Sequence, residues 1–278
     1  MHCGRDGQCG VWVKTGGGAA VAVLEFVKQV LAVAEAEARK LRHDPMELFT
    51  RAVQPTLWLV VFGQVMSRVR AIPTGEMSYL DFMAPGILAQ SVIFIAIFYG
   101  ISLIWERDLG VLHKYLVSPA YRGALVCGKA VSAGLRALTQ AFIVYLLSLA
   151  LGVHLKLTLL AIVGVLFAIF LGAAIFSTFS LVVACLVKTR ERFMGIGQVL
   201  TMPLFFASNA IYPLSLMPQW LRFISHINPL TYQVDALRAL MVEGGRAAVG
   251  LGIDFAVQAL VLLILLRIAA RLYPNAVN

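Results

Sequence analysis

One stretch of this sequence comes near to a nucleotide-binding motif. It ends with Gly128, Lys129 and Ala130. The run Gly123-Ala-Leu-Val-Cys-Gly128-Lys129-Ala130 has the glycine and lysine spacing of a phosphate-binding loop. However, Ala130 stands where that motif needs a hydroxyl group for magnesium, no β-strand pattern precedes the run, and the residues enter an apolar helix. We therefore expect no nucleotide site on this chain.

The other reactive residue types are too scattered to form a catalytic site. Zinc hydrolysis needs paired histidines on a helix, and magnesium-dependent transferases need clustered aspartates; neither pattern occurs. The histidines are His2, His43, His113, His154 and His226. Gly100-Ile101-Ser102 could hold the serine of an intramembrane protease, but no histidine lies at a comparable depth in a later apolar segment. We interpret this common tripeptide as a helix-packing feature.

Acidic residues also fail to predict a proton-driven transporter. Such a mechanism needs carboxylates deep in the membrane, whereas Glu106 and Asp254 lie at the ends of apolar segments, where we expect them to reach water. The sequence pattern thus contains neither a nucleotide or proton-coupling site as an energy source nor a catalytic group. A docked partner would have to supply the work, and the chain itself is not expected to be an enzyme.

Composition predicts a helical membrane protein. Only 13% of the residues are charged, about half the share of a soluble domain, and the mean hydropathy is +0.85. A β-barrel would show short alternating segments instead of long apolar runs. The net charge of +9 is interpreted as cytoplasmic loops that face anionic lipid, so nucleic acid is not expected as a partner.

Six apolar segments are long enough to cross a bilayer as helices. They run at about Leu48 to Ser67, Phe82 to Trp105, Val126 to Leu151, Leu157 to Val187, Phe193 to Tyr212 and Leu251 to Leu272. Pro55 predicts a kink in the first segment and Pro203 a break in the fifth, because proline removes a helical hydrogen bond. Lysine and arginine gather on one side of the predicted membrane, which places both termini in the cytoplasm.

Two parts precede the six-span domain, which we assign to residues 44–278. Residues 1–22 are glycine-rich, without periodicity, and are expected to form a disordered leader. Residues 23–43 carry an apolar stripe opposite charged faces, which is typical of a helix that lies in the membrane interface. The same pattern fits a helix packed on the bundle, and the sequence leaves both alternatives open.

Two segments between the spans have distinctive patterns. In residues 106–124, Leu109, Leu112 and Leu116 recur at helical spacing until Ser118-Pro119 ends the helix, so a short amphipathic helix is predicted on the cytoplasmic side between the second and third spans. Residues 213–250 are apolar in patches but broken by prolines, with no stretch long enough to cross. This second segment predicts a pair of re-entrant or interfacial helices at the outer side.

Together these two segments resemble ABC type-2 exporter permeases. The cytoplasmic segment carries the resemblance through Glu106-Arg-Asp-Leu-Gly110, Tyr115-Leu-Val-Ser-Pro119 and Gly128-Lys129. The outer segment carries it through Ile211-Tyr-Pro-Leu214, Met217-Pro-Gln-Trp-Leu221, Ile227-Asn-Pro-Leu-Thr-Tyr232 and Asp235-Ala-Leu-Arg238. The chain is most similar to the branch of daunorubicin-type drug exporters and nodulation-factor exporters, over about residues 25 to 272.

The resemblance implies an all-α membrane subunit that pairs with a second permease copy, as a homodimer or heterodimer, in a prokaryotic plasma membrane. Separate ABC ATPase subunits would bind ATP and magnesium, so this chain would hold no cofactor. The helix from Glu106 to Pro119 would be the coupling helix seated on the ATPase. Its implied coupling residues are Glu106, Gly110, Leu112, Leu116, Ser118 and Pro119. The implied outer gate comprises Tyr212, Pro213, Pro218, Trp220, Asn228, Pro229 and Tyr232.

On this interpretation the cargo is an amphipathic small molecule, a lipid or a glycolipid that moves outward. Three alternatives stay open. A carbohydrate exporter of the same family would share both signatures. An intramembrane enzyme would rest on Ser102 and would be active without a partner. A non-transporting anchor or sensor would recruit an ATPase without moving cargo.

Overall fold

The computed structural model describes residues 27–32, 35, 53–69, 72, 77–109, 122–187 and 189–273. Within these residues the chain is mostly helical and forms no β-strand beyond one isolated bridge. The elements are η1 (Trp58–Gly63), α3 (Gln64–Val69), α4 (Tyr79–Tyr99), α5 (Ile101–Asp108), α7 (Arg122–Ala150), α8 (Leu159–Leu186), α9 (Arg190–Phe206), η2 (Leu214–Leu216), α10 (Gln219–Ile227), α11 (Pro229–Met241) and α12 (Leu251–Leu272). The segment 110–121 lies outside the described residues.

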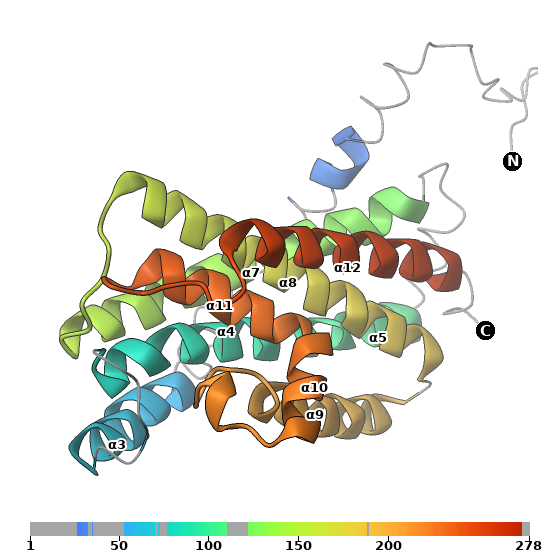
Figure 1. Ribbon diagram of the computed structural model, residues 1–278. Coiled ribbons are helices and arrows are strands. Elements are labelled where there is room, and N and C mark those ends of the chain that lie inside the picture. Colours follow the sequence, from blue (N-terminus) through green and yellow to red (C-terminus); the bar gives the residue numbers. More distant parts are fainter. Residues whose placement is uncertain are drawn as a thin grey trace, which may run out of the picture.

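Helix α4 is the centre of the bundle (Figure 1). It begins at Ser78, whose side chain accepts a hydrogen bond from the Asp81 amide and so caps the first turn. Almost every side chain of α4 is buried, because η1, α7, α8, α9 and α11 all pack on it. A helix that is apolar all round is stable only in such surroundings.

The longest helices agree with four of the predicted spans. Four stretches of the described chain are long and apolar enough to cross a membrane: Tyr79–Asp108, Gly123–Ala150, Leu159–Leu186 and Leu251–Leu272. The first runs on through α5, and Gly100 forms the turn between α4 and α5. In the most apolar 18 residues of each stretch, the buried share is 78% in the first stretch and 17% in the last, so α12 lies at the edge of the bundle.

The first and fifth predicted spans differ from the expectation in detail. In the first span, the helix after Pro55 is wound as the π-helix η1, an irregularity of the kind that accompanies bends. In the fifth, the predicted break at Pro203 is wrong, because α9 runs through this proline and ends at Phe206. Pro203 lies in the last turn of the helix, so its missing hydrogen bond falls close to the end.

The helix ends gather at two opposite ends of the bundle. At one end, the Tyr79 hydroxyl donates a hydrogen bond to the Ile211 carbonyl (3.2 Å), and Leu155 bridges Val242. Both boundaries of the segment that contains α10 and α11 therefore lie at the Tyr79 end of α4. We call this the Tyr79 end. At the other end, α5 closes against the turn between α8 and α9.

Candidate functional site

Glu106 is the one predicted coupling residue within the described part of the chain. Gly110, Leu112, Leu116, Ser118 and Pro119 lie outside the described residues. The expectation that Glu106 reaches water is wrong, because only 7% of the residue is exposed. The Lys129 Nζ atom lies 2.8 Å from Oε1 and 2.8 Å from Oε2 of the Glu106 carboxylate. A buried carboxylate needs a partner of this kind.

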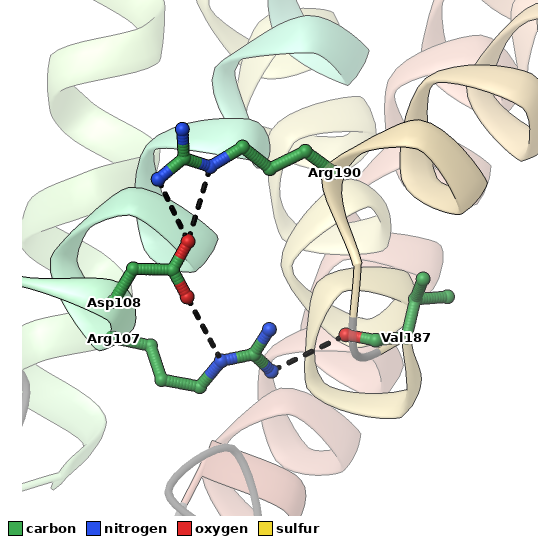
Figure 2. Close-up of polar contacts among 4 residues, drawn as sticks. All are labelled: Arg107, Asp108, Val187 and Arg190. Atoms are coloured by element: carbon green, nitrogen blue, oxygen red, sulfur yellow. Dashed lines mark hydrogen bonds and ion pairs between the residues drawn. The ribbon is translucent and has the colours of Figure 1, made fainter.

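The two residues after Glu106 bind the turn between α8 and α9 (Figure 2). Arg107 donates a hydrogen bond to the Val187 carbonyl at the end of α8 (3.3 Å). Arg190, at the start of α9, donates to the Asp108 carboxylate from Nη2 (2.7 Å) and Nε (3.0 Å). Two-pronged arginine contacts fix orientation as well as distance.

The end of α5 is thus held to α7 by Glu106 and to the α8–α9 turn by Arg107 and Asp108. We call these contacts the α5 clamp. Arg190 also stacks over the Trp105 ring, with its guanidinium carbon 4.3 Å from the ring centroid. The predicted coupling segment begins at Glu106 of the clamp and ends at Pro119, ten positions before Lys129 of the clamp. A displacement of that segment would therefore act on three helices at once.

A row of polar side chains continues from the clamp along α7. The Tyr99 hydroxyl donates to the Ser132 hydroxyl at 3.2 Å, and the Arg136 guanidinium lies 5.1 Å from the centroid of the Tyr99 ring. Lys129, Ser132 and Arg136 lie on one face of α7, because residues three, four and seven apart share a helix face. This row turns toward α4, because its Ser132 and Arg136 both contact Tyr99 of that helix.

Three of the predicted gate residues lie along one groove between α9 and α10. The groove has a volume of about 530 Å³ and is lined by Tyr212, Trp220 and Asn228, among others. Asn228 holds the hairpin in place: its Oδ1 atom accepts from the Leu230 amide (3.0 Å) and its Nδ2 atom donates to the Leu204 carbonyl of α9 (2.6 Å). Two-thirds of Trp220 is exposed (66%).

The other predicted gate residues define helix boundaries outside that groove lining. Pro213 precedes η2, Pro218 precedes α10, and Pro229 is the first residue of α11. At the start of a helix the backbone N–H has no partner within the helix, so proline, which lacks this group, costs no hydrogen bond there. The Tyr232 hydroxyl donates to the His226 carbonyl at 2.6 Å, closing the turn between α10 and α11.

Gly100 has a packing role in this structure. A Cβ atom at this position would lie 3.0 Å from the backbone of Ser180, so the absence of a side chain lets α4 and α8 approach closely. The Ser180 hydroxyl in turn donates to the Ile97 carbonyl. Gly100 of the Gly100-Ile101-Ser102 tripeptide therefore serves helix packing, in agreement with the interpretation of this tripeptide from the sequence.

Comparison with known proteins identifies the family. Residues 28–242 match the family model described as ABC-2 type transporter. The chain belongs to the ABC-2 type transporter family. Both signatures that carried the resemblance, the cytoplasmic and the outer, begin and end within the matched residues, so the predicted family is confirmed.

Several known permeases are similar in sequence to this ABC-2 permease. A putative transport permease, Ycf38, of Cyanophora paradoxa is 32% identical over 77% of this chain and 74% of its own length. The daunorubicin resistance ABC transporter permease protein DrrB1 of Streptomyces coeruleorubidus is 26% identical over 84% of this chain and 82% of its own length. A probable doxorubicin resistance ABC transporter permease protein, DrrC, of Mycobacterium tuberculosis is 25% identical over 79% of each chain.

Sequence reasoning missed the polar contacts at the Tyr79 end of this ABC-2 permease. The Asp81 carboxylate accepts from the His154 amide (2.9 Å) and lies 3.1 Å from its Nδ1 atom. Arg238 is buried, donates to the Asn209 carbonyl at 2.7 Å and lies over the Phe82 ring at 3.8 Å from the centroid. The Asp235-Ala-Leu-Arg238 signature marked Arg238, but nothing in the sequence indicated its partners.

The prediction that Asp254 reaches water is also wrong. The sequence places it at a span end in contact with water, whereas the structure buries it completely in the first turn of α12. The reason is that α12 packs against both α8 and α11, so the side of its first turn that carries Asp254 meets protein instead of water. Asp235, also buried, accepts a hydrogen bond from the Val249 amide just before the helix (3.0 Å).

Proposed function

We propose that this permease is the membrane-spanning subunit of an ATP-driven exporter that moves an amphipathic small molecule, a lipid or a glycolipid outward. ABC-2 permeases associate with ABC ATPase subunits. ATP and magnesium would be bound by those subunits and not by this chain. Similarity to permeases named for daunorubicin and doxorubicin resistance supports a drug-like or lipid-like cargo.

The observation that carries this proposal is the α5 clamp. The clamp joins the start of the predicted coupling segment to α7 and to the α8–α9 turn, through Glu106–Lys129 and Asp108–Arg190. A coupling helix has to convert movement of a docked ATPase into movement of the bundle. Rigid-body movements of this kind are transmitted through elements that are held by discrete contacts.

The remaining features of the proposal concern the membrane. We propose six spans, with the first at residues 48–67 and the fifth built on α9, added to the four apolar stretches. The α10–α11 hairpin would re-enter the membrane from the Tyr79 end, which is the outer end, and both termini would be cytoplasmic. Buried polar backbone in such a hairpin is tolerated because protein, and not lipid, surrounds it.

The proposed assembly contains two permease copies, identical or different, in the plasma membrane, with one ATPase under each. Basic residues on the cytoplasmic side would contact anionic lipid headgroups. Residues 23–43 would flank the ATPase contact at the membrane interface. Residues 1–22 are proposed to be a disordered leader.

The test is co-purification in mild detergent from the native membrane. Tagged wild-type chain is expected to bring down an ABC ATPase, and the double variant Leu112→Asp/Leu116→Asp is expected to lose it, because the apolar stripe of the coupling segment becomes charged. Leu157→Asp, an exposed change in the loop before α8 at the Tyr79 end, is the matched control. Equal recovery from both variants and the wild type would contradict the proposed docking.

A further inference from the structure

A cavity of about 340 Å³ lies over the middle of α4, with the start of the first span on one side and α7 on the other. Its lining includes Gln54, Pro55, Gln90, Phe94, Phe98 and Gln140. We call it the glutamine groove. A volume of this size falls within the usual range of small-molecule sites.

The two glutamines of the groove lie at the depth of the membrane centre. Gln90 comes 11 residues after Tyr79, the start of α4 (90 − 79), and Gln140 comes 10 residues before Ala150, the end of α7 (150 − 140). The start of α4 and the end of α7 lie at the same end of the bundle, because His154 after α7 binds Asp81. At 1.5 Å per residue both glutamines lie about 15–17 Å from that end, halfway across a core of about 30 Å.

Two of the residues that line this groove, Gln90 and Gln140, have buried amide atoms without a hydrogen-bond partner in the part of the chain that the structure describes. Gln90 is 2% exposed and Gln140 is 1% exposed. Among the described residues, no hydrogen bond is made by Gln90 Nε2 or by Gln140 Nε2 and Oε1. Buried amide groups normally have a partner, and a lipid acyl chain has no group to offer. A ligand with oxygen-containing groups would supply both acceptors and donors.

The rest of the lining defines the chemical class of that ligand. Every side chain that lines the groove is uncharged, so a charged group would lose its hydration there without compensation. The Phe94 and Phe98 rings lie nearly parallel, 14° apart, with centroids separated by 6.2 Å. Together they present flat apolar surface that suits a ring system.

We infer that the glutamine groove is a cargo-binding site for an uncharged, ring-containing lipophile that carries hydroxyl or carbonyl oxygens along one edge. The inference deepens the proposed export function and rests on it. Gln90 and Gln140 donate to the ring oxygens, Gln140 Oε1 accepts from a hydroxyl group, and the two phenylalanine rings cover one face of the ligand.

The groove is also joined to the α5 clamp. Lys129, Ser132, Arg136 and Gln140 share one face of α7, so the same helix that binds Glu106 carries a groove residue three turns further on. A rotation or shift of α7 that follows the clamp would move Gln140 relative to Gln90. Binding and release of cargo would then follow the state of the ATPase.

The test uses the full chain alone in lipid nanodiscs, without an ATPase, and 3-hydroxyflavone as the probe. This compound is an uncharged fused-ring ketone with a hydroxyl group, and the ratio of its two emission bands responds to hydrogen-bond donors. We expect a saturable change in this ratio. Gln90→Leu is expected to weaken binding about tenfold, the effect of losing one hydrogen bond, and Gln140→Leu, which removes both a donor and an acceptor, about a hundredfold. Ser91 also lines the groove, and Ser91→Trp, which fills it, is expected to abolish binding.

The matched control is Gln258→Leu. Gln258 is as buried as the groove glutamines, and its amide atoms also lack hydrogen-bond partners among the described residues, but it lies on α12 outside the groove lining. It should bind the probe as the wild type does. The inference would be overturned by probe partitioning that does not saturate, or by equal weakening in the Gln258 variant. Co-purification of the ATPase does not depend on this result, so failure of the groove and failure of the exporter proposal are distinguishable.

Discussion

The ammonium group of Lys129 lies 2.8 Å from both carboxylate oxygens of Glu106, although 23 residues separate the two in sequence. Both side chains are almost fully buried, with 3% of the Lys129 side chain and 9% of the Glu106 side chain exposed. The pair bridges the predicted coupling segment at its two ends. A buried pair of this type holds two helices in one register because neither charge is stable without the other.

Lys129→Met is predicted to destabilise the permease strongly. The substitution leaves the Glu106 carboxylate buried without its counter-charge, and breaking a buried pair in this way costs about 3–5 kcal/mol. The double variant Glu106→Gln/Lys129→Met removes both charges and should recover most of that loss. Denaturant or thermal unfolding in nanodiscs measures both. Equal stability of the single and double variants would show that the pair is not the cause.

Arg190→Gln is predicted to have a much smaller effect on stability. The Asp108–Arg190 pair is partly exposed, with 42% and 38% of the two side chains accessible, and exposed pairs contribute about 0–1 kcal/mol. The effect should shrink further at high salt, because solvent screens the pair. The same unfolding assay at low and high salt measures the difference. If Arg190→Gln lowered stability as much as Lys129→Met does, the prediction that the exposed pair contributes less than the buried pair would be wrong.

Gly86→Ala is predicted to destabilise the contact between α4 and the turn after α9. A Cβ atom at Gly86 would lie 2.8 Å from the Ala210 Cα atom, so the backbone has to shift, at a cost of about 1–3 kcal/mol. Gly195→Ala in α9 is the matched control, because no atom lies within 4 Å of its Cβ position. That change should stabilise the helix by about 0.5–1 kcal/mol. Opposite signs in a thermal unfolding series are the expected result.

Asn228 is predicted to have two separable roles. Asn228→Ala removes both the cap of α11 and the bond to the Leu204 carbonyl, and loss of a cap alone costs about 0.5–2 kcal/mol. Asn228→Ser keeps an uncharged side-chain oxygen that can cap the helix but loses the amide that donates to Leu204. It should therefore lie between the wild type and Asn228→Ala in unfolding. If the two variants lose the same stability, the cap contributes nothing.

Much of the fold could be predicted from hydrophobic patterning alone. The sixth predicted span and α12 share the bounds Leu251 and Leu272, and the fourth span differs from α8 by two residues at its start and one at its end. Pro213, Pro218 and Pro229 were predicted to break the outer segment, and each falls at a helix boundary. These features depend on local sequence, so local reasoning is enough for them.

The partners of individual side chains could not be predicted in the same way. Glu106 and Asp254 both lie at helix ends, and sequence position alone places them near water. Their burial depends on which helices cover those ends, and so on the rotation and register of α7 and α11. The contacts of Arg238 with Asn209 and Phe82 are likewise set by packing between distant elements. No periodicity within one segment contains that information.

The central claim is that the Glu106–Lys129 pair transmits ATPase movement to the bundle. It is tested most directly by a fluorophore attached at Phe223→Cys, an exposed position on α10, in a chain without its four native cysteines. The assembled transporter in nanodiscs is expected to change emission on addition of ATP. The double variant Glu106→Gln/Lys129→Met should retain the bound ATPase and lose this change. Glu191→Gln, an exposed change at the start of α9, should keep it. An ATP-dependent change of wild-type size in the double variant would contradict the claim.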